Sequence, residues 1–321
     1  MKMINMLRKL YGLQLTTCVM CLLILTQPIA YGKDNPKITF TFKPTNNLTF
    51  TQKFTSIREK HLGSTGHKKE ETKTTSKITY KQTSTGWDVI IRPQESIHIR
   101  NGEVVKNLIQ DLISNLNITY KLDAQGKILD IIGYDELSKV FKERFPLQAA
   151  SLFSNMVKVE TLKEREISEW NRRIGNLIGK TVSIGETWNH DEPFKLPNDT
   201  VLTYQVKTLF AEMKPCGPQN QNQCIQIIQE YTTDAAKVSG MLTDMMQKVT
   251  GATTPKDEKK NSEPDKNPSS IQGKVMRLID PQTMRIYDES SERTMRVEVD
   301  VPEQGRLPSV VVETQKYVNE F

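Results

Sequence analysis

The densest group of potentially catalytic or metal-binding residues in the sequence surrounds His190. Glu186, Asp191 and Glu192 lie within four positions of it. An imidazole and carboxylates are the groups that general acid–base catalysis uses, and they are also metal ligands. A closed metal site needs four well-placed ligands, however, and the polar stretch before Pro193 is typical of a solvated loop. We therefore interpret the cluster as loop residues and keep a hydrolase of unfamiliar type, using the acids around His190, as an alternative.

The other histidines and the common catalytic motifs predict no further site. His61 and His67 flank a Ser/Thr/Gly turn, and we expect no acid or cysteine beside them at a ligand spacing. Residues 175–181 approach a phosphate-binding loop but leave three residues between the glycines, where the motif needs four, and they end a helix instead of opening one. Neither Gly-x-Ser-x-Gly nor His-Glu-x-x-His occurs. The sequence thus predicts no catalytic residue, no cofactor and no metal.

Two cysteines, Cys216 and Cys224, flank a turn rich in Pro, Gly, Asn and Gln between two strand-like runs. In an exported chain such a pair predicts a disulfide that clamps the tip of a hairpin. A catalytic or metal-binding pair is disfavoured, because no His or acid lies between them. Cys18 and Cys21 fall inside an apolar run near the N-terminus, so their spacing is not a redox or zinc signal.

This apolar run belongs to a segment with the features of a secretory signal peptide. A basic start precedes a mainly apolar segment of thirteen residues, 13–25, and small residues at Ala30 and Gly32 suit cleavage after either one. The run is shorter than the roughly 20 residues that span a bilayer, so we expect a periplasmic or secreted protein without a stable transmembrane segment after cleavage. Residues 1–32 hold three basic residues and no acidic ones, so their removal lowers the net charge from +6 to +3. With no basic stripe carrying aromatics, nucleic acid is not an expected partner.

The elements that must position these residues are mostly strands. Over residues 33–249, alternating apolar and polar residues predict antiparallel strands with one face in water, interrupted by a helical insert at 135–178. Residues 250–270 are charged and Pro/Ser-rich and predict a disordered linker, and 271–321 return to strands that complete the same sheet. The predicted fold is mainly β (α+β): a large curved antiparallel sheet or partly open barrel, with a central insert of about three helices packed on one face.

Large aromatic residues gather in and just after the helical insert, namely Phe141, Phe145, Phe153, Trp170 and Trp188. Their ordinary interpretation is core packing. The alternative is an apolar cleft between sheet and helices that holds a hydrophobic guest such as a lipid.

Two short motifs carry a resemblance to a known family. Residues 120–137 give a strand, Asp-x-x-Gly-Lys, a second strand and Gly-x-Asp-Glu-Leu, and residues 185–188 give Gly-Glu-Thr-Trp. In these motifs the chain resembles a family of exported bacterial β-rich proteins known only as a domain of unknown function. More weakly, its predicted arrangement of a curved sheet around helices is similar to that of periplasmic lipoprotein carriers. The resemblance implies a curved sheet embracing helices, with lipid or another envelope protein as partner, and it assigns no catalytic residue.

The function we expect is that of an exported envelope protein acting as a non-catalytic binding or assembly module, with a hydrophobic ligand between sheet and helices. The hydrolase near His190 is one alternative. A structural or surface-interaction protein without a small-molecule site is the other.

Overall fold

The computed structural model describes residues 36–63, 66–106, 111–112, 116–144, 159–195, 201–217, 220–233, 238, 270–301 and 305–321. They belong to one compact unit, Pro36–Phe321. The predicted signal peptide lies outside the described residues, and so does the predicted linker apart from Ser270. None of the described helices is long and apolar enough to cross a lipid bilayer.

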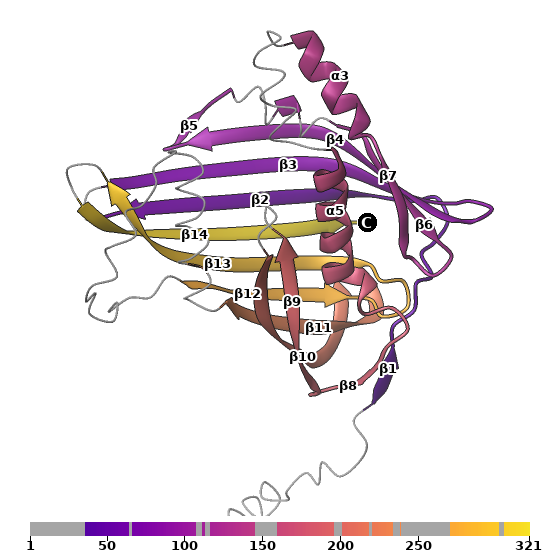
Figure 1. Ribbon diagram of the computed structural model, residues 1–321. Helices are drawn as coiled ribbons and strands as arrows, with labels where there is room; N and C mark the ends of the chain where they lie inside the picture. The colour runs from indigo at the N-terminus through magenta and orange to yellow at the C-terminus, as the bar shows by residue number, and fades with distance from the viewer. Residues whose placement is uncertain are drawn as a thin grey trace, which may run out of the picture. The chain divides into compact units, whose positions relative to one another are not determined.

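Twelve strands of the described residues form one antiparallel sheet (Figure 1). Its order is β7-β6-β4-β3-β2-β14-β13-β12-β11-β10-β9, with β5 paired to β4 beside this path. Its strands are β2 (Leu48–Leu62), β3 (Gly66–Gln82), β4 (Gly86–Arg100), β5 (Glu103–Val104), β6 (Ile118–Asp123), β7 (Ile128–Ile132), β9 (Thr187–Lys195), β10 (Val201–Gly217), β11 (Asn220–Thr233), β12 (Ser270–Ile279), β13 (Ile286–Val301) and β14 (Gly305–Glu320). The described path ends at β7 and at β9, so the sheet is not closed. The predicted mainly-β, antiparallel class is confirmed.

The first and last strands of this sheet meet in its middle. β14 pairs with β2 from Ser309 opposite Leu62 to Glu320 opposite Thr51. The C-terminal strands therefore belong to the same sheet as the N-terminal ones. A separate two-stranded sheet joins β1 (Lys37–Thr39) to β8 (Thr181–Ser183).

Alternation along the strands gives the large sheet two different faces. Phe50 of β2 and Ile78 of β3 are paired and buried; we call the face that carries them the inner face and the opposite one the outer face. Helix α5 (Val159–Trp170) lies on the inner face (Figure 1). Trp170 at its end packs edge-on against Tyr120 of β6, with ring centroids 5.8 Å apart. A short π-helix, η1 (Asn171–Gly175), continues α5.

Of the predicted helical insert, 135–178, the structure describes the two ends, 135–144 and 159–178. Helix α3 (Asp135–Arg144) begins with the acidic pair Asp135 and Glu136, which suits the positive end of a helix dipole. Its Leu137 is buried against residues that include Leu112 and Leu162. Residues 145–158, where a further helix was predicted, lie outside the described residues.

The turn between β6 and β7 forms where the sequence predicts it. The Asp123 carboxylate accepts hydrogen bonds from the main-chain N–H groups of Gln125 and Lys127, both at 2.9 Å. Gly126 has φ +84°, a conformation that L side chains rarely adopt. Any Cβ at this position would also meet the ring of Phe42 at 2.6 Å, so both the turn and the packing require glycine.

The main hydrophobic core fills the space between the inner face and the α5–η1 segment. It takes side chains from β2, β3, β4, β6, β7, β10, β11, β12 and β13 together with the helical residues Trp170 and Ile174. Phe40 and Phe42, just after β1, are buried in it as well. Although β1 ends at Thr39, the alternating apolar side chains of Ile38, Phe40 and Phe42 all face the core.

Two parts of the sheet differ from the sequence prediction. The stretch predicted as a solvated loop around His190 is the edge strand β9, which pairs with β10 over nine residues. Pro193 is compatible with a strand that has a neighbour on one side only. β2 and β3 also run further than their apolar residues suggest, because hydrogen bonds between main chains extend a strand without apolar side chains.

Candidate functional site

The predicted disulfide is present. Cys216 and Cys224 are bonded at the end of the β10–β11 hairpin, and both are buried. The bridge closes the hairpin in the place that the sequence predicts.

Trp170, one of the residues predicted for an apolar cleft, is packed into the core. Its ring stands edge-on to those of Phe42 and Tyr120, at 6.2 and 5.8 Å between centroids. Its indole N–H donates a hydrogen bond of 2.9 Å to the carbonyl oxygen of Gly126. This hydrogen bond connects the end of α5 to the β6–β7 turn.

Trp188, also predicted for the cleft, packs against a different part of the same core. It lies on β9, edge-on to Phe210 of β10 at 4.6 Å, with the Lys180 ammonium 5.0 Å from its ring centroid. The side chain of Phe141 in α3 and all of Phe145 and Phe153 lie outside the described residues. The two tryptophans of the predicted cleft thus make ring contacts with different partners, and a cleft formed by all five aromatics stays a prediction.

Of the acids around His190, Glu192 lies on the same face of β9, two residues along, whereas Glu186 and Asp191 do not meet the imidazole. Both oxygens of Glu186 accept hydrogen bonds at 2.7 Å, from the Ser183 N–H and the Trp188 indole N–H, and these two bonds lower the pKa of Glu186. His190 and Asp191 are neighbours in β9, so their side chains point to opposite faces of the sheet. Glu186, His190 and Asp191 therefore do not form one catalytic group.

On the inner face, a buried charged cluster joins η1 to the centre of the sheet. The same oxygen of Glu289 (β13) accepts hydrogen bonds from Nε of Arg277 (β12), at 2.7 Å, and from Nε of Arg173 (η1), at 3.0 Å. Arg277 also donates to the amide oxygen of Gln229 on β11. Arg277 and Glu289 are only 2 % and 3 % exposed, so this cluster is part of the core and fixes where the helical segment rests.

The outer face carries a groove of about 980 Å³ that crosses strands β9 to β13. Two rows of laterally paired side chains form its walls. The first, which we call the charged row, consists of Asn189, Lys207, Glu230, Lys274 and Glu292. The second, the amide–hydroxyl row, consists of Asp191, Gln205, Thr232, Gln272 and Thr294. Residues between the rows, such as Val206, turn their side chains to the inner face, so the floor of the groove is main chain.

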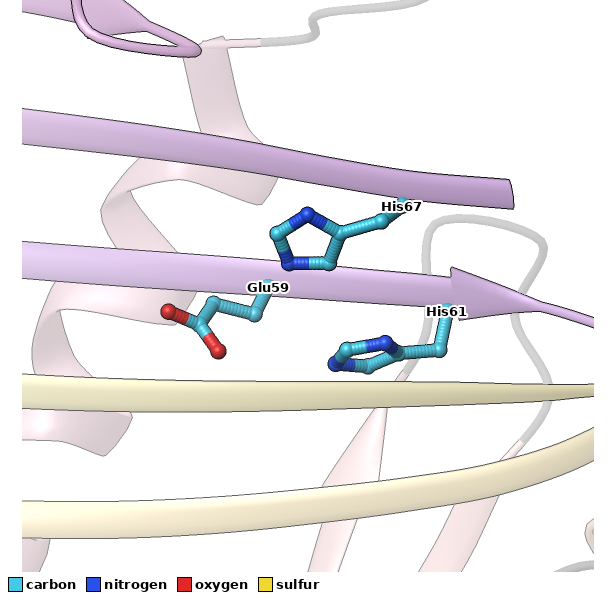
Figure 2. Close-up of side chains that lie close together, drawn as sticks. All are labelled: Glu59, His61 and His67. Carbon is cyan, nitrogen blue, oxygen red and sulfur yellow. The ribbon is translucent and has the colours of Figure 1, made fainter. Parts of the chain in front are cut away.

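A second outer-face feature lies at the far end of the β2–β3 hairpin, where Glu59, His61 and His67 converge (Figure 2). One ligand atom from each residue lies within 4.8 Å of the other two. The prediction that no acid lies beside these histidines is therefore wrong. The missed signal is Glu-x-His followed by a short turn and a second His: alternation puts Glu59 and His61 on one face, and the hairpin brings His67 directly opposite His61.

Comparisons with known proteins show little. No family model matches the chain, and no curated protein matches it. Among solved structures, it is similar to one titled "Lipid-protein interactions in lipovitellin", with a TM-score of 0.42, 12% identity and 87% of this chain covered. It is also similar to one titled "Structure of DynF from the Dynemicin Biosynthesis Pathway of Micromonospora chersina", with a TM-score of 0.20, 8% identity and 92% of each chain covered.

This chain spans about a quarter of the lipovitellin chain, 26% of its length. Neither likeness is close enough to bear on function. The resemblance to exported bacterial proteins, read from residues 120–137 and 185–188, stays a prediction.

Proposed function

We propose that this chain is an exported, non-catalytic binding module that holds an extended, hydroxyl-rich ligand of the oligosaccharide class in the outer-face groove of β9–β13. The observation that carries this proposal is the pair of polar rows that forms the walls of the groove. Strands in a sheet lie about 4.8 Å apart and residues on one face of a strand about 6.8 Å apart. Five strands therefore give a groove about 19 Å long and about 7 Å wide, dimensions that suit a chain laid across the strands.

The chemistry of the two rows favours a ligand without strong charge. In the charged row, Lys207, Glu230, Lys274 and Glu292 stand opposite one another in alternating sign, and the Lys274 ammonium lies 3.7 Å from the Glu230 carboxylate. These charges offset each other across the strands. The second row offers mainly amides and hydroxyls, which both donate and accept hydrogen bonds. Hydroxyl groups of a sugar chain match such a wall.

A peptide is the less suitable occupant of this groove. Peptides that bind sheets commonly add a strand along an edge, where main-chain groups are free. Here the strands under the groove are interior apart from β9, and their main-chain groups bond to neighbouring strands. A ligand that lies across these strands can therefore be bound only by their side chains, through hydrogen bonds.

The described part of the inner face gives less support for the hydrophobic ligand predicted from the sequence. Around Trp170 the space is occupied by Phe42 and Tyr120. Beside it, the charged cluster of Arg173, Arg277 and Glu289 lies under η1. Export to an oxidising compartment is supported by the Cys216–Cys224 bridge, because disulfides persist there.

The test is a binding screen of the purified protein against a panel of neutral oligosaccharides, followed by calorimetric titration of any that bind. Gln205→Ala combined with Gln272→Ala removes two amides from one wall. At about 1 kcal/mol for each hydrogen bond, affinity should fall by roughly 30-fold.

Gln226→Ala is the matched control, because Gln226 lies on the outer face of β11 beyond the groove. It should leave affinity unchanged. The proposal fails if no oligosaccharide binds, or if the double variant and the control bind equally well.

A further inference from the structure

The side chains of Glu59, His61 and His67 form a group outside the groove, and the function proposed above does not use them. They lie near the end of the β2–β3 hairpin, on one side of the two strands (Figure 2). His61 and His67 are a direct cross-strand pair whose ring centroids are 4.8 Å apart. The hairpin geometry holds the two imidazoles together, because β2 and β3 stay in register from Leu48 to Leu62 without a bulge.

We propose that Glu59, His61 and His67 form a binding site for a divalent transition-metal ion, zinc foremost. Two imidazoles and one carboxylate are a donor set that zinc accepts, and such three-residue sites leave a coordination position for water or an outside ligand. Imidazole-rich sites also suit copper(II) and nickel(II), and copper(II) would bind more tightly by the general affinity order. Calcium and magnesium, which prefer oxygen donors, are poor matches.

The distances are close to those that coordination requires. With bonds of about 2.0–2.1 Å, the ligand atoms of a tetrahedral zinc site lie about 3.3 Å apart. The three candidate ligand atoms lie within 4.8 Å of one another, so they must approach by about 1.5 Å at most. Both histidines are exposed, and exposed side chains change rotamer freely. The main chain therefore does not have to move.

The immediate surroundings leave the site accessible. On the β14 side, Val310 and Val312 stand opposite His61 and Glu59, so these two positions bring no competing charge. On the β3 side, the Lys69 ammonium is 3.1 Å from the Glu59 carboxylate. Its hydrogen bond and charge lower the pKa of Glu59, and the ionised group has two oxygens. One oxygen can stay with Lys69 while the other binds the metal.

The alternative explanation is that the two histidines only stack as a cross-strand ring pair. Such pairs stabilise a sheet without any ion. The two explanations differ in a measurable way, because stacking predicts no stoichiometric zinc binding and no role for Glu59.

The experiment is a calorimetric titration of ZnCl₂ into the purified chain, produced without a histidine tag and treated with a chelator beforehand. We expect one zinc bound per chain. His61→Ala, His67→Ala and Glu59→Gln should each weaken binding at least about tenfold, since even second-shell changes cost 10–100-fold.

His190→Ala is the matched control: it removes another exposed histidine, on β9, and should leave zinc affinity unchanged. Circular dichroism and thermal melts without metal establish that each variant is folded. The proposal is overturned if the native chain binds no zinc in this titration, or if His61→Ala and Glu59→Gln bind it as the native chain does.

Discussion

The buried carboxylate of Glu289 should make the stability of this protein depend on pH in the acid range. Burial alone would raise its pKa, but the charges of Arg173 and Arg277 and the hydrogen bond from Arg277 lower it from 4.5 to about 2. A folded-state pKa below the unfolded value means that ionised Glu289 stabilises the fold above pH 4.5. This stabilisation is lost as the pH falls from there toward 2.

The magnitude follows from the shift. A difference of about 2.5 pKa units corresponds to about 3 kcal/mol at pH 7. At pH 3, where the unfolded chain is already protonated at this group, only about 1 kcal/mol remains. The variant Glu289→Gln cannot ionise, so its deficit in unfolding free energy relative to the native chain should be about 2 kcal/mol smaller at pH 3 than at pH 7.

The assay is urea unfolding of both proteins at pH 7 and pH 3, since urea adds no salt to screen the charges. Glu320→Gln serves as control, because Glu320 pairs with Lys53 at the surface, where both side chains are more than half exposed. Exposed pairs contribute little, so that variant should change little at either pH. If the deficit of Glu289→Gln is the same at both pH values, the paired carboxylate is not the source of its stabilisation.

Two further predictions concern fixed points of the fold. Reducing the Cys216–Cys224 bridge, whose residues are 8 positions apart, should lower the unfolding free energy by about 2.5 kcal/mol in the loop-entropy model; an unchanged melt of fully reduced protein would contradict this. Gly126→Ala should destabilise by about 2 kcal/mol or more, because it combines a φ of +84° with a Cβ 2.6 Å from the Phe42 ring. Gly179→Ala serves as control, because Gly179 has a similar φ of +78° but open space around an added Cβ. It should lose less unfolding free energy in the same urea assay, and the difference between the two variants measures the clash with Phe42. Equal losses would mean that the Phe42 contact is unimportant.

Much of the architecture was predictable because it depends on local patterns. Alternation marks strands with one buried face, and an Asp-x-x-Gly turn such as Asp123–Gly126 joins two of them regardless of what lies further away. The stretch around His190 was mispredicted for the same reason. Its polar side chains are typical of a loop, and only the neighbouring strand β10 supplies the main-chain partners that make it β9.

The candidate sites were much less predictable. Each wall of the groove takes one residue from each of five consecutive strands, β9 to β13. Gln205 and Thr294 belong to one row only through the register of these strands, which no spacing in the sequence indicates. The Glu59–His61–His67 group is more local. It was recoverable only by assuming that β2 and β3 form one hairpin with His61 opposite His67.

By itself, the sequence determined the mainly-β class, the cysteine pair and the turn at Asp123–Gly126, because backbone preference and burial act over a few residues. The tertiary structure alone decided the strand order, the place of β14 between β2 and β13, and the meeting of Arg173 with Glu289 across 116 positions. Those features depend on contacts between segments that are distant in the sequence. The free energy that favours this arrangement is distributed over many such contacts, and no short stretch of sequence contains them.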